Sequence, residues 1–365
     1  AHSGGSSCIP SRYALMTGRF AVRRSMGLSE GSLIEPERMT IASMLRGQGY
    51  RTAMVGKWHL GFDPYLQNAK APADYNKPLK GGPVDCGFDS FFGMHASLDL
   101  PPYFYIRGCM ATSPPTGDIE HHDNVGEEEG WNQIQGAFWR KGKIAPDFDM
   151  EQVTPRLFSE ACKLIKNHAG TKNNKPLFLY LALPSPHTPW LPLEKYRGKS
   201  GAGMYGDFVL QVDDGVGEVI AALKSAGMAD HTLVIFSSDN GPVWYDKDRE
   251  KFGHDSVGGL RGMKFSSHEG GHRMPFIARW PAKVPAASVS AQPVVFSDLL
   301  ATCTEITGQK NIPEGMAEDS ISFHAHLVGD KVKPEPRPAI VHDRKTIRSG
   351  DWKLILPGMH GRKQT

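Results

Sequence analysis

Hydrophobic residues along this chain follow two spacings, one typical of strands and one typical of amphipathic helices. Short apolar runs predict strands at 50–55, 177–183, 232–236 and 276–280. Apolar residues three or four apart predict helices at 41–45, 154–167, 205–226 and from 297 onward. The unbroken runs predict strands that are buried in the sheet, at 177–183 on both faces. This alternation predicts an α/β fold with a mostly parallel sheet flanked by helices.

The region from 62 to 146 interrupts the alternation. It is polar and rich in Pro and Gly, which favours an exposed insertion loop. His121, His122 and Asp123, with the acidic run at 127–129, suggest a metal site, but their spacing matches no regular ligand pattern, so we prefer the loop. Four aromatic residues either form a sugar-stacking wall or anchor the loop to the core, and both alternatives stay open: Tyr103, Tyr105, Trp131 and Trp139.

The end of the chain differs in pattern from the rest, and both ends are abrupt. Past residue 330 a Pro-rich segment is followed by short strand patterns at 339–342 and 352–356. We therefore expect a large α/β domain at 1–330 and the start of a small antiparallel subdomain at 331–365. Because the chain starts at Ala1 without an initiator Met or a signal peptide and ends abruptly, we interpret it as a fragment truncated at both ends.

Composition excludes several classes of function. The net charge of +3 provides no general attraction for nucleic acid. No run reaches the ~20 consecutive apolar residues of a membrane-spanning helix. The five cysteines are irregularly spaced, and the sequence does not decide whether they pair: Cys8, Cys86, Cys109, Cys162 and Cys303.

Polar motifs follow three of the predicted strands, at the end where open α/β sheets bind ligands. Residues 56–61 follow the first strand, residues 184–189 the second, and residues 237–242 the third. In the third motif, Asp239 and Asn240 offer carboxylate and amide oxygens, which suit a hard cation. Because Asp-Asn-Gly alone is a common turn, its position after a predicted strand carries the inference.

The most distinctive motif lies near the start of the chain. Residues 8–12 are Cys-Ile-Pro-Ser-Arg, and residues 15–19 are Leu-Met-Thr-Gly-Arg. This pair resembles the motif of the type I sulfatases, members of the alkaline phosphatase superfamily, in which a formylglycine-generating enzyme oxidises the cysteine to formylglycine. The alternative is that Cys8 is an ordinary buried or free thiol.

Four further motifs resemble those of the same family and occur in the same order. They are Gly56-Lys57-Trp58-His59-Leu60-Gly61, Pro186-His187-Thr188-Pro189, Asp239-Asn240-Gly241, and the segment 262–275 with Lys264 and Glu269-Gly270-Gly271-His272-Arg273. This last segment departs from the family at His268, where an aromatic residue is frequent, and at Met274, where Val is common. We assign no chemistry to His268 or His272.

The resemblance implies an alkaline phosphatase-like fold and a sulfatase reaction. The hydrated aldehyde derived from Cys8 attacks sulfur and forms a sulfo-enzyme intermediate. The family pattern also implies that Arg12 binds the diol, that Lys57 and Lys264 bind the sulfate oxygens, that His59 takes the proton of the diol, and that His187 protonates the leaving alcohol.

The family also uses a divalent cation. By resemblance, residue 8, Asp239 and Asn240 bind it, with Ca²⁺ as the expected ion and Mg²⁺ as an alternative. Sulfatases carry two more metal-binding aspartates ahead of the Cys motif, and this sequence does not include that segment. We therefore expect a poor cation site and little activity for this chain, and an active, periplasmic or secreted parent protein.

Three functions remain in competition. The first is hydrolysis of a sulfated carbohydrate or an aryl sulfate. The second is hydrolysis of phosphonate or phosphate monoesters, since some members of the superfamily use formylglycine for this reaction. The third is non-catalytic binding of sulfated glycans, which predicts that Cys8 stays unmodified.

Overall fold

The computed structural model describes residues 1–24, 26, 31–67, 73–124, 131, 134–171, 175–309, 311–329, 337–344 and 346–357. The acidic run at 127–129 and the predicted domain boundary at 330 lie outside these residues. The chain forms two compact units. Unit 1 comprises Ala1–Gly27, Ile34–Gly49 and Ala229–Thr365, and unit 2 comprises Leu28–Leu33 and Tyr50–Met228.

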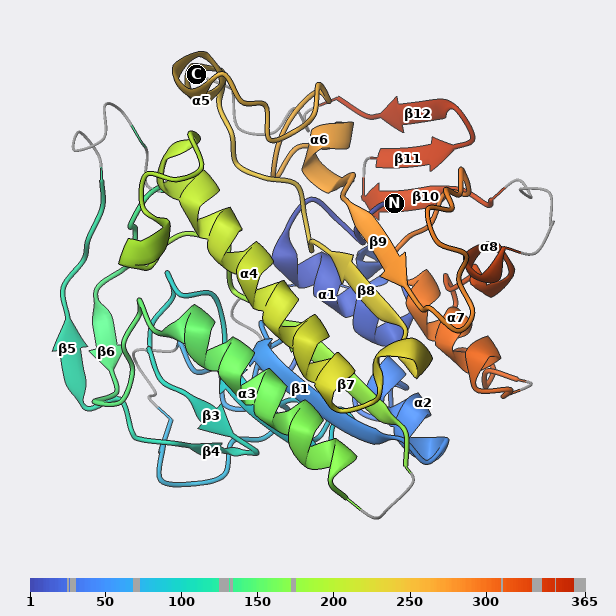
Figure 1. The fold of residues 1–365 in the computed structure, drawn as a ribbon, viewed down its shortest axis with the longest axis horizontal. Helices are drawn as coiled ribbons and strands as arrows, with labels where there is room; N and C mark the ends of the chain where they lie inside the picture. Colours follow the sequence, from blue (N-terminus) through green and yellow to red (C-terminus); the bar gives the residue numbers. More distant parts are fainter. Residues whose placement is uncertain are drawn as a thin grey trace. The chain divides into compact units, whose positions relative to one another are not determined.

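Unit 2 contains a five-stranded mixed sheet with the order β4-β3-β2-β1-β7 (Figure 1). Its strands are β1 (Arg51–Lys57), β2 (Ser90–Met94), β3 (Ile106–Arg107), β4 (Met110–Ala111) and β7 (Leu177–Ala182). The central strand β1 runs parallel to both β2 and β7, whereas β3 and β4 are antiparallel additions beyond β2. Because β1 has a neighbour on each side, all its residues after Arg51 are buried.

Two long helices of unit 2 lie side by side, and one of them packs on the sheet (Figure 1). They are α3 (Val153–Ala169), which contacts β1 and β2, and α4 (Gly203–Ser225). Helix α3 buries one apolar face, including Leu157, Phe158 and Ile165, as its spacing predicts. Unit 2 also contains β5 (Gly117–Ile119), β6 (Gly142–Ile144) and the short helix η2 (Glu194–Tyr196).

Two expectations about unit 2 were wrong. The region 62–146 is not simply an exposed loop, because it supplies β2, whose Phe91 and Phe92 are buried beside β1. The surrounding Gly, Pro and polar residues hid this five-residue strand. Strand β7 was expected to be buried on both faces, but it is the last strand of its sheet and most of its residues are half-buried.

In unit 1, three helices pack together: α1 (Cys8–Thr17), α2 (Ile41–Gly47) and α7 (Asp298–Ile306). Helix α2 begins with a reciprocal cap in which Thr40 and Ser43 each accept the backbone N–H of the other. Helix α1 ends at Gly18, whose φ of +66° allows its N–H to reach the Ala14 carbonyl. The other helices are η1 (Ala21–Arg23), η3 (Ala229–His231), α5 (Asp246–Phe252), α6 (Glu269–His272) and α8 (His324–Val328).

Two small antiparallel sheets complete unit 1 (Figure 1). One pairs β8 (Val234–Ser237) with β9 (Phe276–Arg279). The other contains β10 (Ile340–Asp343), β11 (Thr346–Ser349) and β12 (Trp352–Ile355), as expected for the end of the chain. Strand β8 was expected to be buried, but its residues are half-buried or exposed, with Phe236 38% exposed, because β9 is its only partner in this sheet. Among the described residues no helix is long and apolar enough to cross a membrane.

Candidate active site

Cys8 opens helix α1 and is 4% exposed. Arg12 lies one turn later on the same side of the helix. Its guanidinium donates from both Nε and Nη2 to Oδ2 of Asp239, each at 2.9 Å. Because Arg12 is buried, this charged pair ties the first turn of α1 firmly to the Asp-Asn-Gly motif that follows β8.

Asn240 presents an oxygen suited to a cation. Its Nδ2 donates to the Gly241 carbonyl at 2.9 Å, and its buried Oδ1 has no hydrogen-bond partner in the structure. A buried amide oxygen without a donor is costly, so this position suits an electropositive ligand. Together with the Asp239 carboxylate, it fits in kind the oxygen donors that a hard divalent cation takes.

The glycine of Asp-Asn-Gly, Gly241, is required for a steric reason. A Cβ at Gly241 would lie 1.8 Å from the Gly270 carbonyl oxygen, and the Gly241 N–H donates to the Gly271 carbonyl at 2.9 Å. Only glycine permits this close approach of two backbones. The Asp-Asn-Gly and Glu-Gly-Gly motifs, 28 positions apart between Gly241 and Glu269, therefore pack directly against each other.

The backbone at Lys264 and Phe265 is hydrogen-bonded to residues next to two other motifs, Asp-Asn-Gly and the Cys motif. The N–H of Lys264 donates to the Pro242 carbonyl, and the N–H of Phe265 donates to the Ser6 carbonyl, each at 2.8 Å. Phe265 has a φ of +70°, a strained conformation for a residue with a side chain. The Lys264 side chain is 8% exposed, and buried lysines are rare outside functional or paired positions.

In unit 2, Lys57 ends strand β1 and is 1% exposed. The chain then continues along the end of β2. There the backbone N–H of Trp58 donates to the Met94 carbonyl, and the backbone N–H of His59 donates to the His95 carbonyl. His59 has a φ of +60°, so it too is held in a strained backbone conformation. Strain of this kind is concentrated at functional sites, and here it falls on a motif histidine.

His187 follows β7, the other parallel neighbour of β1. Its Nδ1 lies 2.7 Å from the Thr188 carbonyl and 3.8 Å from Oδ1 of Asp99. Because a carbonyl only accepts, Nδ1 carries a proton, and in the neutral ring the lone pair is on Nε2. Asp99 is buried and also bonds Arg140 at 2.6 Å.

The structure therefore arranges the predicted residues in two groups. Unit 1 brings together the segments that carry Cys8, Arg12, Asp239, Asn240 and Lys264. Unit 2 places Lys57, His59 and His187 at the carboxyl ends of adjacent parallel strands. Asp99 was missed by the sequence analysis, although an aspartate flanked by Leu98 and Leu100 is a signal that could have found it.

Of the two alternatives for the four aromatic residues, the sugar-stacking wall is wrong for three of them. Tyr103, Tyr105 and Trp131 are at most 2% exposed and pack inside unit 2, where Trp131 meets Trp190 edge to face. Only Trp139 is half-buried, with its ring stacked on His122. These aromatics anchor the loop to the core, which is the second of the two alternatives.

The metal site considered for the loop is tested only in part, because the acidic run at 127–129 lies outside the described residues. His121 pairs with Asp123 at 2.8 Å on an exposed surface, and within the described ranges neither belongs to a group of three potential metal ligands. No disulfide joins the five cysteines, all of which lie among the described residues.

Known proteins resemble this chain in sequence. The sulfatase family model matches residues 1–309. An N-acetylgalactosamine-6-O-sulfatase of Bacteroides thetaiotaomicron is 32% identical over 395 residues, which cover 98% of this chain and 74% of that protein. The N-acetylgalactosamine-6-sulfatase of Sus scrofa is 29% identical over 346 residues, covering 90% of this chain and 58% of that protein.

The fold is similar as well. A solved structure from work on the metabolism of multiple glycosaminoglycans by Bacteroides thetaiotaomicron superimposes with a TM-score of 0.81 at 28% identity. The match covers 97% of this chain and 79% of that one. The chain spans about three quarters of the bacterial relative and less than two thirds of the Sus scrofa relative. With the family model matched over most of its length and the ordered motifs in place, this chain belongs to the sulfatase family.

Proposed function

We propose that this chain is the catalytic part of a sulfatase that hydrolyses sulfate esters of carbohydrates with a formylglycine made from Cys8. The observation that carries the proposal is the buried cysteine at the start of α1, one turn before an arginine bound to Asp239. An ordinary core cysteine needs no charged pair beside it. A nucleophile that must be ionised and oriented does.

The first half of the proposed reaction uses residue 8 as nucleophile. One hydroxyl of the hydrated aldehyde gives its proton to the Asp239 carboxylate and attacks sulfur as the oxyanion, and the S–O bond to the alcohol breaks. His187 acts in its doubly protonated form: Nδ1 donates to the Thr188 carbonyl, and the second proton, on Nε2, passes to the departing alcohol oxygen, which leaves a neutral ring. Lys57 and Lys264 stabilise the negative charge on the sulfate oxygens, and their burial strengthens that effect.

The second half releases sulfate. His59 removes the proton from the remaining hydroxyl, the C=O bond of the aldehyde re-forms, and the bond from carbon to the sulfated oxygen breaks. Arg12 stabilises the ionised diol while it holds Asp239 in place. The cation, held by residue 8, Asp239 and Asn240, would lower the pKa of the diol and favour its ionised form. Its ligands are oxygens, which favours Ca²⁺, with Mg²⁺ as the alternative.

The substrate follows from the relatives. Two of them are named for the 6-sulfate of N-acetylgalactosamine, so we propose this ester, within a sulfated glycan, as the first carbohydrate to test. Aryl sulfates serve as simple reporters. We further propose that a formylglycine-generating enzyme matures Cys8 and that the parent protein is periplasmic or secreted.

The chemical test is a mass measurement combined with hydrolysis assays. Co-expression with a formylglycine-generating enzyme should lower the mass of the peptide containing residue 8 by about 18 Da, as expected for exchange of a thiol for an aldehyde. Because a poor cation site is expected for this chain, the same preparation should cleave 4-nitrophenyl sulfate only slowly, and Cys8→Ala should not cleave it at all. A preparation that carries the aldehyde but cleaves phosphonate esters faster than sulfate would identify a phosphonate hydrolase. An unmodified Cys8 that binds sulfated glycans without cleaving them would identify a binding protein.

A further inference from the structure

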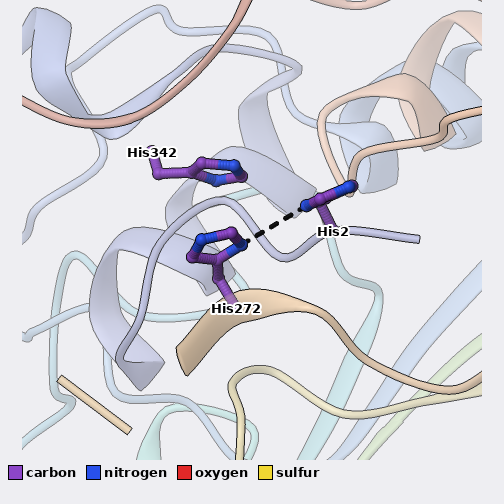
Figure 2. A group of neighbouring side chains, drawn as sticks. All are labelled: His2, His272 and His342. Atoms are coloured by element: carbon purple, nitrogen blue, oxygen red, sulfur yellow. Dashed lines mark hydrogen bonds between the residues drawn. The ribbon is translucent and has the colours of Figure 1, made fainter. Parts of the chain in front are cut away.

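Three histidines from distant parts of unit 1 meet in its interior (Figure 2). His2 precedes α1, His272 ends α6, and His342 lies in β10. None of the three is more than 5% exposed. One nitrogen from each ring lies within 4.8 Å of the others, and within the described ranges this is the only group of at least three potential metal ligands. The sulfatase reaction proposed above uses none of them.

Two of the nitrogens already have the separation of metal ligands. Nδ1 of His2 lies 3.3 Å from Nδ1 of His272, as the dashed line in Figure 2 shows. Two imidazole nitrogens bound to one tetrahedral Zn²⁺, with Zn–N of ~2.0–2.1 Å, lie about 3.4 Å apart. The pair therefore needs almost no movement to share an ion.

The third histidine is unsatisfied in this structure. The His342 ring stacks on His272 with a centroid distance of 3.6 Å (Figure 2). Within the described residues neither of its ring nitrogens makes a hydrogen bond of regular geometry, and the Ser3 backbone is only a weak acceptor nearby. Leaving a buried polar group without a partner costs free energy that a ligand would recover. Turning the ring to direct a nitrogen at the His2–His272 pair breaks the stack and, at most, the weak contact with the Ser3 backbone.

The groups around His272 act in opposite directions on which ring nitrogen is available to a metal, and Glu269 can release Nδ1 for binding by holding Lys353. Nε2 of His272 lies 3.4 Å from the Ser267 carbonyl and 4.0 Å from Oε1 of Glu269, acceptors that favour a proton on Nε2. Lys353 competes, because its Nζ lies 2.6 Å from the same Nε2. The Glu269 carboxylate accepts from Lys353 and from Arg348, so it can hold Lys353 when Nε2 carries the proton.

The histidines are held in the neutral form that binds metal. Burial is the main cause: it lowers the pKa of His2 to about 3 and that of His272 to about 4, and it lowers the pKa of His342 well below its ordinary 6.5. Each ring therefore keeps a lone pair at neutral pH.

We propose that His2, His272 and His342 form a binding site for a transition-metal dication such as Zn²⁺. Three imidazoles suit zinc, copper, nickel or cobalt and do not suit Ca²⁺ or Mg²⁺, so the site differs in chemistry from the oxygen donors at Asp239 and Asn240. A water completes the coordination. The bound ion joins the segment before Cys8, the helix after Lys264 and the C-terminal sheet.

The test is a titration of the protein with metal ions, in which calorimetry measures the binding. For this test the protein is expressed with a few extra residues ahead of Ala1, because a free α-amino group beside His2 would itself bind metal. Bound metal is removed before the titration. Zn²⁺ should bind at one equivalent in the presence of excess Ca²⁺, and Co²⁺ should give the visible absorption bands of a tetrahedral nitrogen-ligated site.

Matched variants assign the ligands. His342→Phe keeps an aromatic ring for the stack but removes a ligand, and it should weaken Zn²⁺ binding by about 100-fold or more. His231→Phe changes an exposed histidine of the same unit and should bind as the parent does. Lys353→Met removes the competing cation and should bind Zn²⁺ more tightly. Circular dichroism spectra identical to that of the parent show that the variants fold.

The proposal is overturned if the unmutated protein takes up no stoichiometric Zn²⁺, or if His342→Phe binds Zn²⁺ equally well. Neither result depends on whether Cys8 is modified or on sulfate hydrolysis, so the site can fail while the proposed function stands.

Discussion

At the scale of single residues, the contact that matters most is the one between Arg12 and Asp239. Both Nε and Nη2 of Arg12 reach the same carboxylate oxygen, a planar, two-point contact that a lysine cannot reproduce. The arginine therefore provides positive charge and also holds a candidate metal ligand in position.

We expect Arg12→Lys to lower kcat for 4-nitrophenyl sulfate by about 10² to 10³, the usual effect of losing one group that stabilises the transition-state charge. The matched control is Arg46→Lys, which makes the same change at an exposed position in α2. Steady-state kinetics on the modified enzyme measure both. Equal rates for the two variants would remove Arg12 from the proposed mechanism.

Asp207 is a second residue with a definite local task. It is buried in α4 and accepts the backbone N–H groups of Gly198, Lys199 and Ser200 at 2.7–3.1 Å. Burial acts to raise the pKa of Asp207, but these hydrogen bonds outweigh it, and the pKa is lowered from its ordinary 3.8. A lowered carboxyl pKa adds stability above the unfolded value near 3.8 and loses it as pH falls through the folded value.

Asp207→Asn should therefore reduce the free energy of unfolding at pH 7 by about 1–3 kcal/mol, because the charged acceptor is lost. The difference from the unmutated protein should begin to shrink below about pH 4, where the carboxyl is protonated in the unfolded state, and should vanish only below the lowered pKa of the folded state. Urea denaturation at pH 7 and at pH 3 measures it. Asp213→Asn, at an exposed position of the same helix, is the control and should stay within about 0.5 kcal/mol of the parent. A pH-independent difference would contradict the assigned role.

At the scale of elements, the pairing of β1 with β7 depends on one glycine. Gly56 lies opposite Ala182 with a φ of +119°, and a Cβ there would lie 2.1 Å from the Ala182 carbonyl oxygen. The glycine lets β1 approach β7 closely just before Lys57, so it helps to place the motif that carries Lys57 and His59.

We expect Gly56→Ala to lower the free energy of unfolding by more than about 3 kcal/mol, since it combines a left-handed φ with a backbone clash. Gly49→Ala is the control, because Gly49 has a φ of +83° but no atom within 4 Å of its Cβ position. That variant should cost only the strain of a left-handed residue, about 1–2 kcal/mol. Chemical denaturation compares the two, and similar losses would show that the clash is relieved by strand movement.

At the scale of the whole molecule, the order of motifs along the chain was the most reliable information. Each motif lies at the end of an observed strand or the start of an observed helix, as predicted for the motif with Lys57 at the end of β1 and for His187 after β7. The helix that begins at Cys8 was not predicted. Local periodicity identified β1, β7, α2, α3 and α4 within a few residues, because helix and strand spacing arise from backbone geometry alone.

Other features could not be read from the sequence. Strand β2 was hidden within a Pro- and Gly-rich region, and β8 was expected in a buried sheet although it pairs antiparallel with β9. The aromatic residues from Tyr103 to Trp131 carried no signal that separates a binding wall from a core. In each case the outcome depends on partners distant in sequence, which short-range patterns do not specify.

By itself the sequence determined the class of fold, the nucleophile candidate and the charged residues that accompany it, because these reside in short motifs whose chemistry is local. Tertiary structure decided which of those residues are tied together, as in the contact of Arg12 with Asp239, 227 positions away. It alone brought His2 within 3.3 Å of His272. The reason is physical: periodicity and motifs record what neighbouring residues need, whereas burial and close approach of distant side chains appear only when the elements pack.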